Sequence, residues 1–314
     1  MHENQPSPIS QKGLSVLISG GNGLIGRHLT SSLLSAGYTV SHLSRKIDQI
    51  DNVRVFLWDP SKRMIDPESI EGADYIIHLA GANIGARRWT RERKKEILES
   101  RTESARFLHQ TVTRRGIQLK AFISASASGI YGTETSEKIF SENDPPAGDF
   151  LGNVCKLWEE AADLFANSGI RTVKIRTAVV LEKNDSALSK LMKPGKFGFL
   201  IQTGTGLQYM PWIHITDLCN IYLKAIEDMK MSGAYNAVSP QHMTHSDFMH
   251  VLARVMNIPV LRVPVPGFVL RILLGEMSDV ILKGSRVSCD KITAEGYRFI
   301  FNNLEAALKN VIPG

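Results

Sequence analysis

The sequence predicts an α/β fold, in which a Rossmann-like, doubly wound parallel sheet is joined to a smaller mixed α/β C-terminal lobe on the substrate side. Short apolar runs alternate with helical patterns through the first two-thirds of the 314 residues. Such alternation is typical of strand–helix–strand units that place helices on both faces of a parallel sheet. Near the N-terminus, the apolar residues 16–18 lead into a glycine-rich turn at 20–26, and a helical pattern at 27–36 follows.

The remaining elements are expected in the following order. Strands are predicted at residues 38–43, 53–58, 73–79, 121–125 and 171–180. Helices are predicted at residues 90–115, 153–168 and 216–228. The pattern changes after residue 181, where the glycine-rich residues 190–208 have no clear period and predict a loop or a short strand. Short helical patterns return at residues 268–274 and 303–309.

These elements divide the chain into an N-terminal extension and two larger parts. Residues 1–13 are polar, contain two prolines and predict a disordered extension. Residues 14–181 form the expected Rossmann domain, and residues 182–314 form the expected second lobe. Within this second part, residues 210–238 are expected to return to the Rossmann domain.

Composition narrows the class of protein. Hydrophobic residues make up 43% of the chain and charged residues 22%, as in soluble globular proteins. The net charge of +6 suits an anionic small molecule, but no basic stripe interleaved with aromatic residues indicates nucleic acid. The three cysteines lie far apart, and no apolar run is long enough for a signal peptide or a membrane span. We therefore expect a cytoplasmic protein without a membrane partner, and a homo-oligomer remains open.

The glycine-rich turn is the most specific motif. Glycines allow a chain to turn tightly and to approach a pyrophosphate, whose charge then lies at the N-terminus of the next helix. The spacing can be read from Gly20 or from Gly21, in both cases with Gly23 and Gly26. An ordinary turn of an α/β protein is the alternative. The strand before the turn and the helix after it favour a dinucleotide site.

The end of the second strand indicates which dinucleotide is bound. An acidic residue here binds the ribose 2′-hydroxyl of NAD, whereas an arginine accommodates the 2′-phosphate of NADP. The chain instead has Ser44, Arg45 and Lys46. One hydroxyl and two cations predict NADP, although the cations could also do no more than solvate the strand end.

A cluster of histidines offers a possible metal site. Residue types that bind zinc occur together at His242, His245, Asp247 and His250. The same segment, from Thr244 onward, resembles the N-cap of a helix at 248–255. The spacing gives no convincing ligand geometry, and no general-base glutamate accompanies it. We therefore predict no metal site.

Several further motifs follow the glycine turn in one order: Ser44-Arg45-Lys46, His78-Leu79-Ala80-Gly81, Arg88-Trp89, Ser100-Arg101, Tyr131-Gly132, Trp158-Glu159 and Trp212-Ile213-His214-Ile215. In this combination the chain resembles the epimerase-family proteins of the YfcH type, an atypical branch of the extended short-chain dehydrogenases/reductases. The resemblance runs from Leu14 to the C-terminus. It implies that residues 261–310 form the small C-terminal domain of that family.

The resemblance also implies how the cofactor is held. The pyrophosphate would lie on Gly20, Gly23, Gly26 and the backbone amides of Leu24 and Ile25. The 2′-phosphate would be held by Ser44 and Arg45, with Lys46 beside them. The adenosine ribose would pack against Leu79 and Ala80. Two helix positions near the cofactor are Glu96 and Arg101, which could equally be members of surface ion pairs.

The catalytic residues of this superfamily are incomplete in the chain. Its reductases use a serine and a Tyr-x-x-x-Lys pair, in which the lysine lowers the pKa of the tyrosine that transfers the proton. Lys156 would need a tyrosine at position 152, which is Gly152. The usual serine position, counted back from Tyr131, falls on Ala127. The family shares the absence of the pair, which removes the usual mechanism.

The remaining candidates for catalysis are Ser126, Ser128 and Tyr131. Either serine could bind a carbonyl or a hydroxyl, or could only form a turn at the strand end. Tyr131 or His214 could replace the missing proton donor, although both are more typical of a structural role. Trp212 and Asp217 are expected to fix the substrate-side loop, and Asp217 lies near the start of the helix at 216–228, where a carboxylate caps backbone amides.

Two functions are consistent with these residues. The first is an NADP(H)-binding oxidoreductase, or a protein like the nucleotide-sugar epimerases, that acts on an unknown small polar substrate. The retained hydroxyls and the covering lobe favour it. The second is a catalytically silent NADP(H)-binding sensor or regulatory module, which the missing Tyr-x-x-x-Lys pair favours. No pattern in the lobe identifies a substrate.

Overall fold

A computed structural model of the chain describes residues 13–132, 135–184, 186–202, 204–261, 272 and 275–312. The strands are β1 (Ser15–Ser19), β2 (Thr39–Ser44), β3 (Val53–Asp59), β4 (Met64–Ile65), β5 (Tyr75–His78), β6 (Ala121–Ala127), β7 (Ile139–Phe140), β8 (Thr172–Thr177), β9 (Val179–Leu181), β10 (Leu200–Ile201), β11 (Trp212–His214), β12 (Gly233–Ala237), β13 (Val260–Leu261) and β14 (Arg286–Val287).

The α-helices are α1 (Leu24–Ser35), α2 (Glu68–Glu71), α3 (Arg91–Arg115), α4 (Phe150–Asn167), α5 (Ala187–Met192), α6 (Ile215–Glu227), α7 (His245–Met256), α9 (Asp279–Leu282), α10 (Asp290–Ala294) and α11 (Leu304–Val311). The 3-10 helices are η1 (Pro60–Lys62), η2 (Ser128–Tyr131), η3 (Lys193–Phe197) and η4 (Gly275–Ser278). The predicted extension at 1–13, apart from Gly13, and the predicted helix at 268–274, apart from Ile272, lie outside the described residues.

An eight-stranded sheet forms the centre of the molecule, with the strand order β12-β8-β6-β5-β1-β2-β3-β4. Its neighbours are parallel except for β3 and β4, which pair antiparallel. The chain builds outward from β1 to β3 and then returns to the other side of β1 with β5. Open sheets of this kind bind ligands beyond the carboxyl ends of the strands at such a switch point. The predicted α/β class with a Rossmann-like sheet is confirmed.

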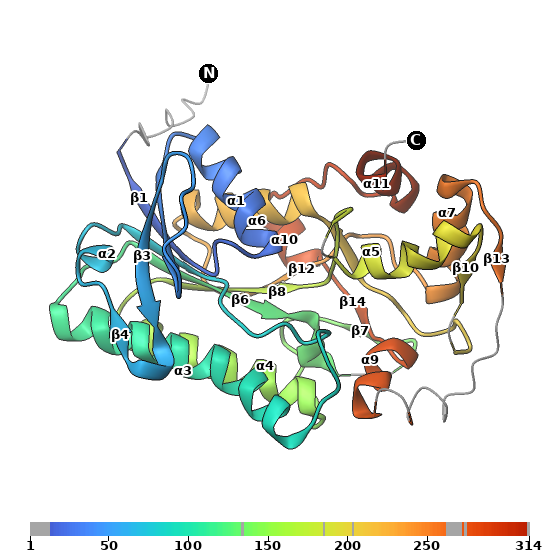
Figure 1. Ribbon diagram of the computed structural model, residues 1–314, viewed down its shortest axis with the longest axis horizontal. Helices are drawn as coiled ribbons and strands as arrows, with labels where there is room; N and C mark the ends of the chain where they lie inside the picture. The colour runs from blue at the N-terminus through green and yellow to red at the C-terminus, as the bar shows by residue number, and fades with distance from the viewer. Residues whose placement is uncertain are drawn as a thin grey trace.

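Helices cover both faces of this sheet (Figure 1). Helix α1 packs against α6 above the sheet in this view, and α3 packs against α4 below it. One buried cluster includes Val16 and Ile18, and the other includes Leu17. Consecutive residues of β1 therefore point into opposite cores, because side chains alternate along a strand. This double burial explains why the strand is a continuous apolar run.

Two elements differ from their predicted bounds for a physical reason. Helix α4 begins at Phe150 because the Asp149 side chain accepts a hydrogen bond from Gly152 N at 2.8 Å and caps the helix. The strand predicted at 171–180 breaks after β8. The chain then leaves the central sheet, because β9 pairs with β11 instead.

The lobe contains α5, α7 and α11, with the strand pair β10 and β13 beside them (Figure 1). Its buried cluster draws on all three helices and includes Leu188 of α5, Phe248 of α7 and Leu308 of α11. Residues 210–238 supply β11, α6 and β12, and β12 pairs with β8 in the central sheet. The chain thus passes between the two parts repeatedly, and β9 extends the carboxyl end of β8 toward the lobe.

Asp217 joins α6 to the last segment of the chain from a fully buried position (0% exposed). The prediction that it caps α6 is wrong, because the His214 ring is the N-cap. The Asp217 carboxylate instead accepts hydrogen bonds from Tyr297 OH (2.7 Å), Ile300 N (2.9 Å) and Phe301 N (2.9 Å). The Asp217 carboxylate therefore provides hydrogen-bond acceptors for backbone N–H groups of this irregular segment, which has no strand or helix partner for them.

Replacement of Asp217 by asparagine should destabilise the protein by about 3 kcal/mol, because its NH₂ group would face a buried N–H and leave polar groups unsatisfied. The expected result is a lower urea midpoint, followed by circular dichroism. Tyr297→Phe removes one donor and leaves both backbone partners of the carboxylate, so its midpoint should fall less. Equal midpoints for Asp217→Asn and the unchanged protein would contradict this role.

Candidate cofactor and substrate site

The glycine turn after β1 lies at the switch point of the sheet, against the backbone that follows β5. Gly20 has φ +78°, and a Cβ there would lie 2.9 Å from Ala80 N. A Cβ at Gly26, in the first turn of α1, would lie 2.5 Å from the Gly21 carbonyl oxygen. No side chain fits at such distances, so backbone packs directly on backbone. Gly23 is the N-cap of α1 and donates its N–H to Gly20 O at 3.0 Å.

The first turn of α1 presents backbone N–H groups at this place, among them those of Leu24 and Ile25. The first N–H groups of a helix have no partner within the helix and carry the positive end of its dipole. Gly23 has no side chain that could cap them. The turn therefore fits the negative charge of a pyrophosphate, and a dinucleotide can approach it closely.

Gly21, the alternative first glycine of the motif, packs against a different group. A Cβ at Gly21 would collide with the ring of His42, which is 2% exposed. His42 Nε2 lies 2.8 Å from Thr30 Oγ1, and burial lowers the pKa of His42 to about 4. Both readings of the motif thus begin at a glycine that the fold requires. No sequence pattern singled out His42, and its only signal is a polar residue within a strand.

Ser44 ends β2, and Arg45 and Lys46 follow it at the same edge of the sheet. Because Ser19 pairs with Leu43 in register, these three residues lie beside the glycine turn. Ser44 Oγ accepts a hydrogen bond from Lys46 N at 3.2 Å. Both cations are exposed, and neither has a carboxylate partner in the part of the chain that the structure describes. They are therefore available to an anionic ligand.

The carboxyl end of β5 forms the wall next to the glycine turn. Leu79 and Ala80 follow the strand and are half-buried, and Leu79 N donates to Ser19 O at 2.9 Å. His78, the last residue of β5, is fully buried, and its Nδ1 lies 2.6 Å from Ser19 Oγ. Burial lowers the pKa of His78 to about 4. A neutral ring thus joins β1 to β5 at the base of the turn.

Arg101 supports the loop that continues from this wall. Its Nη1 donates to Ala82 O at 3.1 Å and to Ile97 O at 2.9 Å. Its guanidinium carbon lies 5.0 Å from the centre of the Trp158 ring. Burial lowers the pKa of Arg101 to about 10, so the group stays charged at pH 7. Arg101 acts here through the loop backbone and not through an ion pair.

Glu96 belongs to an ion-pair cluster on α3, as the alternative for this residue anticipated. Its Oε2 lies 2.6 Å from Arg93 Nη1 and 2.8 Å from Arg87 Nη2. Hydrogen bonds from Arg93 and Arg87 keep the pKa of Glu96 below its usual value. Arg93 is 6% exposed and also donates to the Asn83 carbonyl. Glu96 is thus connected to the loop at 82–90 by its two arginines.

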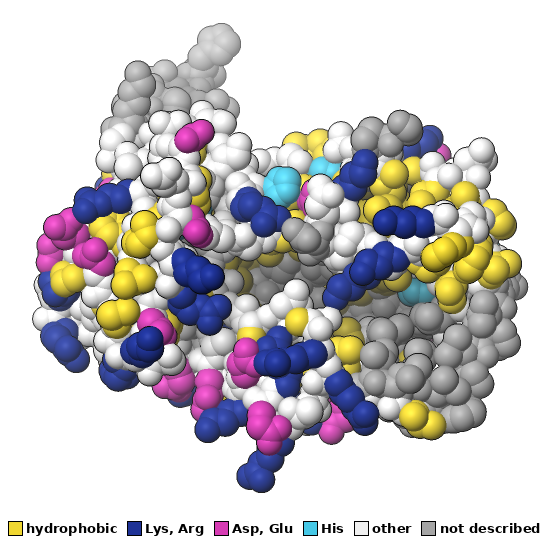
Figure 2. Space-filling view, viewed as in Figure 1, with side chains coloured by type: hydrophobic (Ala, Val, Ile, Leu, Met, Phe, Trp, Pro, Cys, Tyr) yellow, Lys and Arg dark blue, Asp and Glu magenta, His cyan; other side chains and the backbone are white. Residues whose placement is uncertain are grey.

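This loop links the edge of the sheet to the lobe. Lys190 of α5 donates to Gly85 O at 2.9 Å. The Trp89 ring lies 4.9 Å from the ring of Phe150 at the start of α4. Figure 2 shows a hollow in the middle of this face, with Lys and Arg side chains on both sides of it. The loop at 82–90 therefore contacts both α4 and α5, and the hollow on this face is flanked by cationic side chains.

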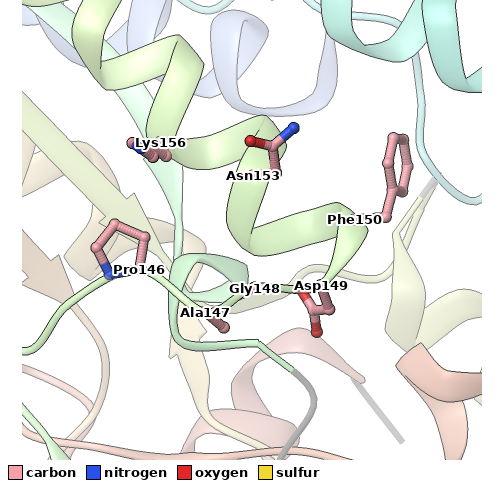
Figure 3. Close-up of a pocket in the computed structure, with 7 residues that line it drawn as sticks. All are labelled: Pro146, Ala147, Gly148, Asp149, Phe150, Asn153 and Lys156. Carbon is pink, nitrogen blue, oxygen red and sulfur yellow. The ribbon is translucent and has the colours of Figure 1, made fainter.

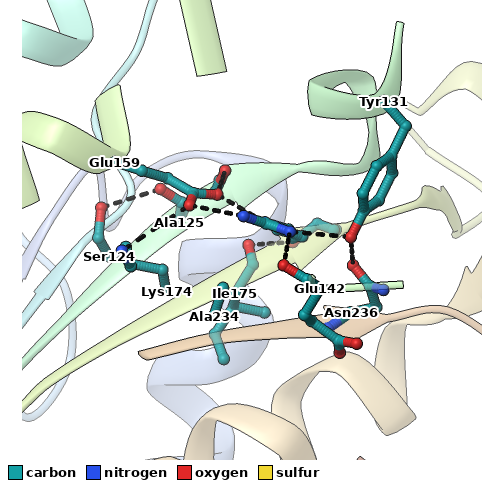
Figure 4. A network of polar contacts seen from close by, with 12 residues as sticks. Ser124, Ala125, Tyr131, Glu142, Glu159, Lys174, Ile175, Ala234 and Asn236 are labelled. Atoms are coloured by element: carbon teal, nitrogen blue, oxygen red, sulfur yellow. Dashed lines mark hydrogen bonds and ion pairs between the residues drawn. The ribbon is translucent and has the colours of Figure 1, made fainter. Parts of the chain in front are cut away.

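A buried polar network lies between α4 and the strands β6 and β8 (Figure 4). Glu159 of α4 accepts hydrogen bonds from Arg176 Nε at 2.8 Å and from Ser126 Oγ at 2.7 Å. Arg176 Nη1 also donates to Tyr131 OH at 2.9 Å, and this hydroxyl donates to Asn236 Oδ1 at 2.7 Å. These five side chains are at most 6% exposed. Each end of the buried charge pair is therefore hydrogen-bonded, as a buried pair requires.

The network determines what the three catalytic candidates can do. Ser126 and Tyr131 are engaged inside the protein, and burial raises the pKa of Tyr131 to about 12. Proton transfer by either residue would require these hydrogen bonds to break. Ser128, at the start of η2, is half-buried and has no hydrogen-bond partner among the described residues. Ser128 thus offers a hydroxyl to a ligand, and the catalytic role of all three remains a prediction.

Helix α4 is the element on which the Tyr-x-x-x-Lys pair would lie. Leu151 and Cys155 form its face toward the end of β6, because a Cβ at Gly129 would lie 3.7 Å from Leu151 Cβ and 3.9 Å from Cys155 Sγ. Gly152 packs against the preceding loop, and Lys156 lies on the exposed side. The pair is absent at 152 and 156, as predicted, and also at 151 and 155, the positions that face the strand.

A pocket of about 410 Å³ opens beside the first turns of α4 (Figure 3). Asn153 and Lys156 line it from one face of the helix, and the loop from Pro146 to Asp149 lines it from the other side. Ala147 N donates to Ile130 O at 2.8 Å, so this loop is attached to η2, the element that carries Ser128. An amide and an ammonium group suit a polar or anionic part of a substrate.

The histidine cluster has the geometry of a helix start. Thr244 Oγ1 accepts a hydrogen bond from Asp247 N at 3.1 Å and caps α7, and the N-cap interpretation is confirmed. Within the described ranges, no three His, Cys, Asp or Glu side chains are placed to hold a metal ion. No helix in the described chain is long and apolar enough to cross a bilayer.

Stability should fall as the pH is lowered from 7 to 5, because His42 and His78 are buried in the neutral form. Their folded pKa values of about 4 lie below the ordinary value of 6.5. The unfolded chain therefore binds more protons in this interval, and protonation favours unfolding. Each histidine should remove about 2 kcal/mol of stability at pH 5. Urea midpoints measured at several pH values test this, and His42→Gln should flatten the dependence. If the urea midpoint of His42→Gln depends on pH as steeply as that of the unchanged protein, His42 does not contribute to the pH dependence.

Comparison with known proteins identifies the family. A profile described as the NAD dependent epimerase/dehydratase family matches residues 16–151. A second profile, described as a domain of unknown function (DUF1731), matches residues 265–311. The epimerase family protein YfhF of Bacillus subtilis is 35% identical over 302 residues, which cover 95% of this chain and 98% of that protein.

Solved structures lead to the same family. The human epimerase family protein SDR39U1, crystallised with NADPH, matches with a TM-score of 0.85 and 30% identity, over 95% of this chain and 99% of that chain. A nucleoside-diphosphate sugar epimerase from Corynebacterium glutamicum matches with a TM-score of 0.77 and 30% identity, over 95% of this chain and 58% of that chain. The resemblance carried by the motifs is confirmed, and the chain belongs to the epimerase family.

Proposed function

We propose that the chain is an NADPH-binding oxidoreductase or epimerase-like enzyme that acts on a small polar molecule with a carbonyl or a hydroxyl group. The observation that carries this proposal is the glycine turn. No side chain fits at Gly20 or Gly26, and the first N–H groups of α1 are directed to the same place. The NADPH complex of human SDR39U1, which shares the fold over 95% of this chain, supports the choice of cofactor.

The residues after β2 support NADPH over NADH. Arg45 and Lys46 stand where an acidic side chain would repel a 2′-phosphate, and Ser44 adds a hydroxyl. A phosphate between two cations forms charge-assisted hydrogen bonds, which are stronger than neutral ones. The exposed position of both cations allows them to reach this group without a change in the sheet.

The remaining chemistry falls to residues at the ends of β6 and α4. NADPH, when bound, supplies a hydride to an acceptor carbon. Ser128 is suited to donate a hydrogen bond to the substrate oxygen, and Lys156 and Asn153 are suited to bind a polar part of the substrate in their pocket. Cys155 cannot supply the proton, because burial raises the pKa of its thiol to about 12. We propose water as the source of the proton, because Ser126 and Tyr131 are hydrogen-bonded within the buried network.

A catalytically silent NADPH sensor is the second candidate function. The missing Tyr-x-x-x-Lys pair favours it, and the face of α4 beside Gly129 carries the apolar residues Leu151 and Cys155. Both functions share the cofactor site, and they differ in whether bound NADPH is consumed.

Arg45→Ala should weaken NADPH binding about 10- to 100-fold, because a charged hydrogen bond contributes roughly 1.5–3 kcal/mol. Binding of NADH should not change, because NADH has no 2′-phosphate. Titration of the purified protein with each nucleotide, followed by nicotinamide fluorescence, measures both affinities. Arg54→Ala is the matched control, since Arg54 is exposed on the neighbouring strand β3 and pairs with Glu68. If neither nucleotide binds at millimolar concentration, the glycine turn is only a scaffold.

Ser128→Ala should lower turnover about 100-fold, because the loss of one hydrogen bond to a developing oxyanion has an effect of this size. The assay follows NADPH absorbance with a panel of aldehydes, ketones and nucleoside-diphosphate sugars. Affinity for NADPH should stay unchanged in the variant. Ser61→Ala, at an exposed turn, is the control. Absence of turnover with the whole panel, together with a change in proteolytic cleavage on NADPH binding, would support the sensor instead.

A further inference from the structure

A second pocket, of about 540 Å³, lies where η1 and β4 meet the C-terminal turns of α3. Strand β4, which supplies Met64 and Ile65 to the lining, is the edge strand of the central sheet and lies beside α3 (Figure 1). None of its lining residues belongs to the glycine turn, to the end of β2 or to the end of β5. The proposed function therefore gives this pocket no role.

The lining of this pocket combines cations with an apolar surface. The cations are Lys62, Arg63, Arg114 and Arg115, and no lining residue is acidic. The apolar side chains are Met64, Ile65 and Phe107. Each side of the pocket contributes both kinds of group: residues 62–65 form one side, and Phe107, Arg114 and Arg115 of α3 form the other. A ligand held here would meet both at once.

Two of the four cations already have acidic partners outside the pocket. Lys62 lies 3.6 Å from Asp59, and Arg115 pairs with Glu71. Arg63 donates to the neutral side chain of Gln110. Arg114 has no carboxylate within ion-pair distance among the described residues. The pocket therefore keeps a positive charge that the described chain does not neutralise.

The arginines at this end of α3 are not needed to close the helix. Gly116 has φ +64°, and its N–H donates to Thr113 O at 3.1 Å. Ile117 N donates to Val112 O at 3.1 Å. These backbone bonds satisfy the terminal carbonyls, as a glycine cap does. Helix capping thus does not account for the charges in the pocket.

Arg63 is held in an unusual backbone conformation. Its φ is 50° and its ψ is 39°, in the left-handed region that favours glycine. The guanidinium carbon lies 5.2 Å from the centre of the Phe107 ring. This backbone places a fixed cation directly beside an apolar wall.

We propose that this pocket binds an amphipathic anion, that is, a carboxylate, sulfonate or phosphate on an aromatic or short alkyl body. Arg63 and Arg114 would bind the anionic head by charge-assisted hydrogen bonds. The apolar body would cover Met64, Ile65 and Phe107, which removes their apolar surface from water. The site is independent of the dinucleotide site and takes a different class of ligand.

The test uses anilinonaphthalene sulfonate, an anionic aromatic dye whose fluorescence rises on binding, with octanoate as competitor. Titrations are made with and without saturating NADPH. The dye should bind in both conditions, and octanoate should displace it. Arg63→Gly and Arg114→Ala should each weaken dye binding at least tenfold. Arg63→Gly should remain folded, because glycine adopts φ 50° without strain.

The matched control is Arg106→Ala, an exposed arginine of the same helix that pairs with Glu103 outside the pocket. It should leave dye binding unchanged. Equal affinities in Arg63→Gly and the unchanged protein would overturn the proposal, as would loss of dye binding when NADPH is added. Displacement by inorganic phosphate as effective as that by octanoate would overturn the amphipathic class of the ligand. The dye titration without NADPH tests this pocket even if NADPH does not bind to the protein, so failure of the proposed cofactor site and failure of this pocket can be distinguished.

Discussion

The close approach of two backbones at the switch point is the constraint on which the rest of the structure depends. Gly20 lies against the backbone at Ala80, and Gly26 lies against the turn itself. A side chain at either position would push α1 away from β5. Because α1 also packs on α6, such a shift would disturb the whole upper layer of helices. The absence of two Cβ atoms therefore fixes both the fold and the place where helix N–H groups face a ligand.

Buried polar groups also hold the strands and helices around the glycine turn in place. His78 joins β1 to β5 through Ser19, and His42 closes the far side of the turn. Both rings are neutral, so His78 links β1 to β5 and His42 links β2 to α1 without the cost of a buried charge. Glu159 and Arg176 do the opposite: they bury a charge pair whose hydrogen bonds hold α4 against β6 and β8. The walls of the site are thus held by groups that do not contact the ligand themselves.

The sequence alone predicted those structural features whose residues are close together along the chain. Continuous apolar strands, the glycine spacing and the cations after β2 predicted the sheet, the turn and the anion-binding edge. It was insufficient where partners are distant along the chain. Tyr131 bonds to Asn236, 105 residues away, and no pattern within either segment indicates this pair. The face of α4 toward β6 likewise needs its tertiary contacts, because Leu151 and Gly152 are neighbours in sequence but lie in different environments.

The residues around α4 explain why cofactor binding does not by itself imply proton transfer. The glycine turn depends only on backbone space and helix N–H groups, and the described chain supplies both. Proton transfer depends on a side chain at a defined place, and the positions of the Tyr-x-x-x-Lys pair hold Gly152 and Lys156. Leu151 and Cys155 make the face of α4 beside Gly129 apolar, whereas Ser128 and Lys156 carry polar groups. The substrate proposed above would thus be oriented by hydrogen bonds and charge, and no tyrosine at position 152 would supply its proton.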